Sequence, residues 1–179
     1  MAEFITHSRA ETVALGERLA QRLAPGTLVC FTGGLGAGKT AFTEGLAAGL
    51  GCTDPVSSPT FAIVNYYRGP RPLAHFDLYR ISSREDLETA GLYDYLDEGA
   101  VVAAEWSENF ADLLALEKPV TVDIRHGGGD EGVISIEGVQ LCSPLDWTAR
   151  AAPPPWASCG TRSFCTRLFS RQATPTAKR

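Results

Sequence analysis

The sequence lacks any apolar run long enough to cross a membrane as a helix, which takes about 20 residues. Its first ten residues, MAEFITHSRA, also lack the apolar centre of a secretion signal. These two absences predict a soluble, cytoplasmic protein with no membrane partner.

Cysteines are few, odd in number and scattered along the chain. They are Cys30, Cys52, Cys142, Cys159 and Cys165. No two of them form a C-x-x-C pair, and their spacing is not typical of a zinc site. We therefore expect reduced, unreactive thiols.

An excess of positive charge is missing as well, since the formal net charge is −5. A protein that coats nucleic acid without sequence preference usually needs a basic surface, so no DNA partner is expected. The lysines are only Lys39, Lys118 and Lys178, and none follows an asparagine. The guanine-specific N-K-x-D motif is therefore absent, which argues against a GTPase.

What the sequence does contain is an alternation of helical and strand patterns. A capping box, Ser8-x-x-Glu11, predicts the start of a first helix, and residues 39–50 predict a second that ends at Gly51. A shorter helix is expected at residues 83–91, and a second short one ends at Gly99. A third is expected after Ser107, which would cap it. Strands are expected at residues 27–31, 60–67, 73–79, 100–106, 120–125 and 132–139.

These elements predict one α/β domain over residues 1–141, a mixed β-sheet with helices on both faces. Residues 142–179 differ in character, because they contain six basic side chains against the single acid Asp146. They also contain the run APPP and show no sustained periodicity. We predict a separate, poorly ordered basic tail there.

The strongest motif is Gly33-x-x-x-x-Gly38-Lys39-Thr40, which follows a predicted strand and opens a predicted helix. This is the context of the P-loop of nucleotide hydrolases, whose backbone N–H groups bind phosphate oxygens. Lys39 would reach the β- and γ-phosphates, and the Thr40 hydroxyl would bind magnesium. The predicted nucleotide cradle consists of Gly33, Gly34, Leu35, Gly36, Ala37, Gly38, Lys39, Thr40 and Ala41.

A P-loop site also needs a carboxylate, usually at the end of a buried strand. Glu105 ends the apolar run AVVAA, and Asp77 lies in the predicted strand LAHFDLY. One of them would hold magnesium and the other would orient the attacking water, and the sequence leaves that division open.

Three further residues are weaker candidates. Thr60, in Ser58-Pro59-Thr60, could bring an oxygen to magnesium or to the γ-phosphate, although a simple turn explains its position better. His75 is expected on a strand surface or behind a ligand rather than as a ligand. Trp106 is expected to pack at the core or edge, with shielding of the site from water or contact with a partner as the alternative roles.

Taken together, five motifs resemble the bacterial TsaE family. They are GGLGAGKT, SSPTF, HFDLYR, EDLETAGLYDYL and VAAEW, spread in the family's order over about residues 3–139. The resemblance implies a P-loop ATPase needed to make threonylcarbamoyladenosine on tRNA. It also implies action on the TsaB–TsaD complex, with tRNA contacted only indirectly and with slow turnover in the absence of those partners.

The resemblance implies ATP and Mg2+ as cofactors and assigns several residues. Thr40 and Glu105 match magnesium-associated positions, and Thr12 matches a position near the nucleotide. Thr60 and Asp77 match switch-like elements, and Asp77 is expected to aid hydrolysis. The residues expected to take part in hydrolysis are Lys39, Thr60, Asp77 and Glu105.

Two regions depart from the family. Many members carry an arginine between the last two strands, where this chain has Asp130 and Glu131. The sequence beyond Leu141 also does not resemble the family.

Two alternatives of other kinds remain open at this point. A small-molecule kinase would need an arginine-bearing lid, for which only Arg80 and Arg84 are available. A nucleotide-gated interaction module would bind ATP to order its switch segments and hydrolyse little of it.

Overall fold

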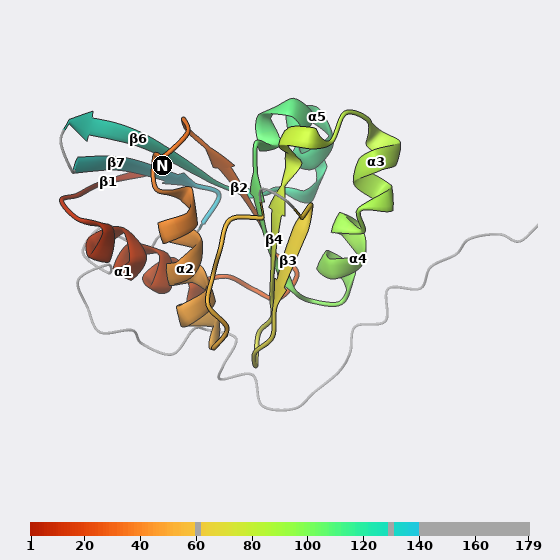
Figure 1. Ribbon diagram of the computed structural model, residues 1–179, viewed down its shortest axis with the longest axis horizontal. Coiled ribbons are helices and arrows are strands. Elements are labelled where there is room, and N and C mark those ends of the chain that lie inside the picture. The colour runs from red at the N-terminus through yellow and green to blue at the C-terminus, as the bar shows by residue number, and fades with distance from the viewer. Residues whose placement is uncertain (60–61, 129–130, 140–179) are drawn as a thin grey trace, which may run out of the picture.

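The computed structural model describes residues 1–59, 62–128 and 131–139 (Figure 1). Thr60, Asp130 and the predicted tail at residues 142–179 lie outside the described residues.

A seven-stranded mixed sheet forms the centre of the described chain (Figure 1). Its strand order is β1-β7-β6-β2-β5-β4-β3. The strands β2, β4, β5 and β6 are parallel neighbours, whereas β1, β3 and β7 pair antiparallel at the two sides. The bounds are β1 Ala2–Thr6, β2 Leu28–Thr32, β3 Val64–Tyr67, β4 Leu73–Asp77, β5 Val101–Glu105, β6 Val120–Gly128 and β7 Glu131–Glu137.

Helices cover both faces of this sheet, as predicted. Helices α1 (Arg9–Ala20) and α2 (Lys39–Leu50) lie on one face. Helices α3 (Arg84–Thr89), α4 (Leu92–Asp97) and α5 (Ala111–Leu114) lie on the other. Each face has its own buried apolar cluster, because successive residues of a strand point to opposite sides. The predicted α/β fold class is confirmed.

Helices α1 and α2 pack unusually close together because glycines line their contact. A Cβ atom on Gly45 would lie 2.0 Å from the Val13 carbonyl oxygen, and one on Gly16 would lie 2.3 Å from the Phe42 carbonyl oxygen. The close contact fixes α2, and with it the P-loop at the start of α2, against α1. Helix α1 begins as predicted, with the Ser8 hydroxyl accepting the backbone N–H of Glu11.

Strand β4 is shorter than predicted because a side chain ends it. The Asp77 carboxylate accepts the Tyr79 N–H at 3.0 Å and begins a 3-10 turn, Leu78–Arg80. Residues 78 and 79 therefore leave the strand. Strand β3 also begins later than predicted, at Val64.

Strand β1 was not among the predicted strands, and it pairs antiparallel with β7 along its whole length. The expectation for Ser107 was wrong. Ser107 does not cap a helix; it lies inside a 3-10 helix, Ser107–Phe110, and its hydroxyl donates to the Phe31 carbonyl at 3.2 Å. The chain turns there through Trp106, whose φ of 59° is left-handed.

Cys30 and Cys52 are free thiols, as predicted, while the other three cysteines lie outside the described residues. Burial raises the pKa of Cys30 to about 11, so this thiol stays protonated and unreactive at neutral pH. In the part of the chain that the structure describes, no helix has the length and apolar content needed to span a bilayer.

Candidate functional site

A cleft of about 1100 Å³ opens at the carboxyl ends of the parallel strands β2, β4 and β5. Its lining comes from the loop after β2, the start of α2 and the ends of β4 and β5. The start of α1 and the adjoining ends of β6 and β7 also contribute. The predicted residues that line it are Thr12, Leu35, Gly36, Ala37, Gly38, Lys39, Thr40, Ala41, Asp77 and Glu105. Ligands of open α/β sheets usually bind at such a crevice beyond the strand ends.

One side of the cleft, which we call the phosphate wall, is the loop and helix start at residues 33–41. Gly33 and Gly38 have φ angles of 125° and 110°, which only glycine adopts without strain. A Cβ atom on Gly33 would also lie 2.2 Å from the Ile124 carbonyl oxygen of β6. The backbone path of this loop is therefore fixed by its glycines.

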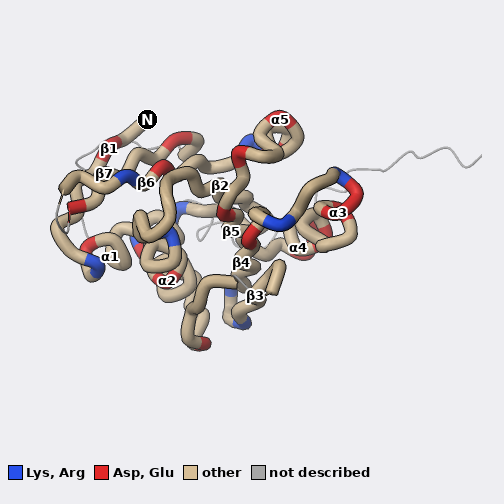
Figure 2. The backbone as a smooth tube through the Cα atoms, turned by 45° about the horizontal axis from the view of Figure 1, so that its top comes forward, with Lys and Arg blue, Asp and Glu red and all other residues tan. Residues whose placement is uncertain are grey.

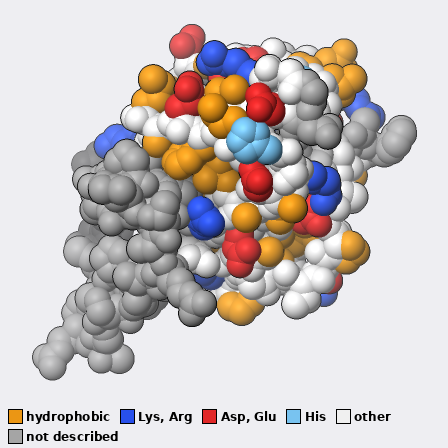
Figure 3. Space-filling view, turned by 90° about the vertical axis from the view of Figure 1, so that its left-hand side faces the viewer, with side chains coloured by type: hydrophobic (Ala, Val, Ile, Leu, Met, Phe, Trp, Pro, Cys, Tyr) orange, Lys and Arg blue, Asp and Glu red, His pale blue; other side chains and the backbone are white. Residues whose placement is uncertain are grey.

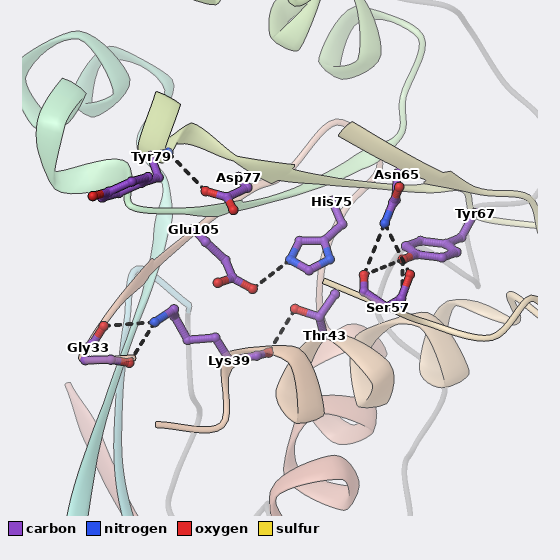
Figure 4. A network of polar contacts seen from close by, with 11 residues as sticks. Gly33, Lys39, Thr43, Ser57, Asn65, Tyr67, His75, Asp77, Tyr79 and Glu105 are labelled. Atoms are coloured by element: carbon purple, nitrogen blue, oxygen red, sulfur yellow. Dashed lines mark hydrogen bonds and ion pairs between the residues drawn. The ribbon is translucent and has the colours of Figure 1, made fainter. Parts of the chain in front are cut away.

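Lys39 is held inside the phosphate wall (Figure 4). Its Nζ donates to the carbonyl oxygens of Gly33 and Gly34, both at 2.9 Å, and the residue is only 6% exposed. Gly33 and Gly34 do not line the cleft themselves. Phosphate oxygens could replace these two carbonyls as acceptors for the ammonium group, because each can accept an N–H bond and phosphate adds charge.

Helix α2 contributes a second phosphate-binding feature. It begins at Lys39, its N-cap is Gly38, and no side chain caps its first turn. The first N–H groups of the helix are therefore left for another acceptor, and the helix dipole favours an anion there.

The opposite side, which we call the carboxylate wall, consists of Asp77, Glu105, His75 and Trp106. Strands β4 and β5 are parallel and Asp77 lies beside Glu105 in register, so both carboxylates reach the same end of the sheet. Both side chains line the cleft. The structure thus brings together two acids that the sequence predicted separately.

The two acids have different surroundings (Figure 4). Glu105 is 6% exposed, and its Oε1 lies 2.9 Å from Nε2 of the fully buried His75. Asp77 is half-buried and accepts only the Tyr79 N–H among the contacts found for it. The sequence left two positions open for His75, a strand surface or a place behind a ligand. The structure shows the second, because His75 is buried and lies behind Glu105.

Trp106 covers the cleft from the carboxylate side. Lys39 Nζ lies 5.1 Å from the centre of the Trp106 ring, a cation–π distance, and Tyr79 contacts the same ring at 5.3 Å. The tryptophan also packs against the apolar cluster of the α3–α5 face. Trp106 therefore packs against the apolar cluster and also lines the cleft, where it can shield the site.

Thr12 reaches the cleft from α1. Its Oγ1 lies 3.0 Å from the Oγ1 of Thr6 on β1, and both residues are buried. Ser8, Arg9, His126, Glu131 and Gly132 also line this end of the cleft and were not predicted. No local pattern could have identified them, because the start of α1 reaches the ends of β6 and β7 only through the pairing of β1 with β7, and these segments are far apart in the chain.

The loop before β3 is fastened at Ser57. The Tyr67 hydroxyl accepts the Ser57 N–H at 3.1 Å and donates to the Ser57 carbonyl at 3.0 Å. Asn65, two residues earlier on the same strand, donates to that carbonyl at 3.2 Å. The next residue, Ser58, lines the cleft, while the candidate Thr60 lies outside the described residues.

The donor set fits magnesium bound together with a nucleotide. Among the residues described, no group of three or more His, Cys, Asp or Glu side chains could hold a metal ion alone. Thr40 and Glu105 do line one cleft and offer hard oxygen ligands. Magnesium is commonly bound by one or two protein oxygens, with phosphates and water supplying the rest.

Comparison with known proteins gives the chain's relatives. The model of the family described as "Threonylcarbamoyl adenosine biosynthesis protein TsaE" matches residues 6–132. The TsaE protein of Bacillus subtilis is 38% identical over 141 residues, which is 75% of this chain and 87% of that protein. The TsaE protein of Synechocystis is 42% identical over 118 residues, covering 62% and 73%.

A solved structure agrees with these matches. The crystal structure of Bacillus subtilis YdiB superimposes with a TM-score of 0.64 at 32% identity, covering 75% of this chain and 83% of that one. The family match spans the phosphate wall, both acids of the carboxylate wall and most of the sheet. The chain belongs to the TsaE family.

Proposed function

We propose that this protein is a magnesium-dependent ATPase that serves tRNA N6-threonylcarbamoyladenosine formation together with TsaB and TsaD. The observation that carries the proposal is that a phosphate wall and a carboxylate wall face each other across one cleft. The first offers N–H groups and a lysine to phosphates, and the second offers carboxylates to a metal ion and a water. The family relatives, named for threonylcarbamoyladenosine biosynthesis, supply the pathway.

The residues would divide the work of hydrolysis as follows. Backbone N–H groups of the phosphate wall bind the phosphates, and Lys39 exchanges its two carbonyl partners for β- and γ-phosphate oxygens. Thr40 and Glu105 would hold magnesium, and the bound ion would supply positive charge next to the transferred group. Asp77, the less enclosed acid, orients the water that attacks the γ-phosphorus, and Trp106 limits access of other water.

The charge of the α3–α5 face supports indirect rather than direct action on tRNA. Between residues 84 and 117 the exposed charged residues are nine acids and one base, Arg84. Figure 2 shows Asp and Glu positions along α3, α4 and α5. Such a surface repels the phosphate backbone of RNA. On the side of β1, β6 and β7, acidic and basic side chains are mixed with hydrophobic ones (Figure 3). We propose that the protein works in the cytoplasm on a protein complex that holds the tRNA.

A small-molecule kinase is the weaker reading of the same cleft. Neither Arg80 nor Arg84, the two arginines considered for a lid, lines the cleft, and Arg9, which does line it, pairs with Glu44 of α2. Arg84 instead pairs with Glu88 at 2.8 Å on the exposed side of α3. The nucleotide-gated module is closer to the proposal. If Lys39 exchanges its contacts with Gly33 and Gly34 for phosphate oxygens, ATP binding by itself changes the structure of the loop, as such a module requires.

The decisive experiment measures ATP turnover by the full chain with magnesium, alone and with purified TsaB and TsaD. We expect slow turnover alone and a clear rise with the two partners. The Lys39→Ala variant in the same mixture should remain at background, which controls for contaminating ATPases. Rapid turnover with a metabolite acceptor, unaffected by TsaB and TsaD, would contradict the proposal and favour the kinase.

A further inference from the structure

The most unusual polar group behind the cleft is the imidazole of His75. It is 0% exposed, and its Nε2 lies 2.9 Å from Oε1 of Glu105. Its other nitrogen, Nδ1, is buried and has no hydrogen-bond partner among the residues that the structure describes. Burial of a half-satisfied imidazole is unfavourable, since an apolar side chain would fill the same space without that cost.

The register of the sheet explains how His75 reaches Glu105. On β4, His75 lies directly beside Ala103 of β5, and Glu105 follows two residues after Ala103 on the same strand face. A diagonal pair of this kind is within reach of long side chains. The small side chain of Ala103 leaves the room that the imidazole crosses.

The contact fixes one oxygen of the carboxylate and leaves the other available. A carboxylate that serves a metal ion accepts hydrogen bonds and donates none, so in that role of Glu105 the contact requires Nε2–H as the donor and Oε1 as the acceptor. In Figure 4 the second oxygen of Glu105 points away from the His75 ring, toward the side on which Lys39 lies. Asp77, the neighbouring acid, has no comparable side-chain partner among its described contacts and is bound only by the Tyr79 N–H.

We infer that His75 is a positioning residue, which orients Glu105 so that a single carboxylate oxygen is presented to the magnesium–nucleotide complex. The inference rests on the proposed function and adds to it a group that does not touch the ligand. It also separates the two acids: Glu105 is the fixed one and serves the metal ion, whereas Asp77 keeps the freedom that water orientation allows. Partners that orient a metal ligand typically contribute 10- to 100-fold to affinity or activity.

The test measures ATP affinity of the full chain with magnesium and again with EDTA, by calorimetry. In the unaltered protein the ratio of the two affinities gives the effect of magnesium. We expect His75→Leu to reduce this ratio by about 10- to 100-fold while the affinity in EDTA changes less than about twofold. His75→Gln should restore most of the ratio, because its amide N–H can reach Oε1. Equal losses with and without magnesium in His75→Leu would mean a merely structural role and overturn the inference.

Coupling to Glu105 provides the second arm. If His75 acts through Glu105, adding His75→Leu to Glu105→Ala should cause no further loss in the magnesium effect. Losses that multiply would overturn the inference. Should the unaltered protein bind ATP with no magnesium effect at all, the proposed function itself would fail, and this inference with it.

A spectroscopic arm covers the case in which His75→Leu does not fold. The chain has three histidines, so nitrogen NMR of labelled imidazoles in the unaltered protein is readily assigned. We expect His75 to carry its proton on Nε2, and the signal to shift in Glu105→Gln. A proton on Nδ1 alone, or a signal indifferent to Glu105→Gln, would overturn the inference.

Discussion

The phosphate wall and the carboxylate wall face the same cleft, but the chain builds them in opposite ways. The phosphate wall is one continuous segment, residues 33–41, whose shape is set by glycines and whose contacts are largely to backbone atoms. The carboxylate wall is made by side chains from two strands, and its hydrogen-bonded pair, His75 and Glu105, is 30 residues apart in the chain.

This difference predicts different consequences of substitution. Backbone N–H groups survive most side-chain changes, so the phosphate wall should be sensitive only at Lys39, at the Thr40 hydroxyl and at its constrained glycines. In the carboxylate wall Asp77, Glu105 and His75 each act through one or two oxygen or nitrogen atoms, so small changes at these three residues should alter one step of the reaction while leaving the others intact.

The largest effect is expected for Lys39→Ala in the phosphate wall. Two charge-assisted bonds to phosphate would be lost, which corresponds to about 4 kcal/mol or roughly a 1000-fold loss of ATP affinity. Calorimetric titration with magnesium and ATP measures this loss. Because Lys39 also bonds to Gly33 and Gly34, thermal unfolding without nucleotide serves as the control for a folding defect. Undiminished affinity in a folded variant would contradict the role of Lys39.

In the carboxylate wall, Asp77→Asn should lower turnover about 100-fold and change ATP affinity less than about twofold. The asparagine oxygen can still accept the Tyr79 N–H, so the 3-10 turn after β4 should persist. Single-turnover hydrolysis in the presence of TsaB and TsaD measures the rate, and calorimetry measures the affinity. The matched comparison is Glu105→Gln, in which the magnesium-dependent ATP affinity should fall more than the turnover does. If both variants lost turnover and magnesium-dependent affinity to the same extent, the two acids would not have separate roles.

The support of the phosphate wall can be tested at Gly45, in the contact between α1 and α2. A Cβ atom at this position would meet backbone atoms of α1, 2.0 Å from the Val13 carbonyl oxygen, and backbone cannot move aside as a flexible side chain can. We expect Gly45→Ala to lower the free energy of unfolding by about 2 kcal/mol, measured by urea denaturation.

Gly34→Ala provides the control, since a Cβ there has no heavy atom within 4 Å. Its unfolding free energy should change by less than about 0.5 kcal/mol. Equal destabilisation by the two variants would mean that the close helix contact does not support the loop.

The same contrast explains what could be predicted from the sequence. The phosphate wall was accessible because a contiguous glycine pattern specifies a backbone path, and helix α2 lies at the predicted residues 39–50. Asp77 and Glu105 could be proposed one at a time from strand ends. Their side-by-side register, and the diagonal contact of Glu105 with His75, depend on how β4 and β5 pair, which no local pattern encodes.

Errors at the element ends have a similar cause. Strand β1 is stabilised by pairing with β7, from the far end of the described chain, and although Phe4, Ile5 and Thr6 favour a strand, five residues are too short a segment to predict one from its own pattern. The chain leaves β4 early because the Asp77 side chain competes for a backbone N–H, and it leaves β5 through the left-handed Trp106. Both departures lie beside the cleft, where local rules are often overridden by the needs of a site.

The smallest effect is expected at Tyr67 of β3, which holds the loop between α2 and β3 through Ser57. Tyr67→Phe removes both hydrogen bonds to the Ser57 backbone but keeps the buried ring, and Asn65 still donates to the Ser57 carbonyl. We expect a loss of about 1 kcal/mol, seen as roughly fivefold weaker ATP binding and faster hydrogen exchange at residues 51–59. Tyr66→Phe is the matched control, because the exposed Tyr66 contributes its ring to Tyr95. Equal effects of the two changes would mean that the Ser57 anchor does not shape the cleft, and that each wall is positioned by its own strand alone.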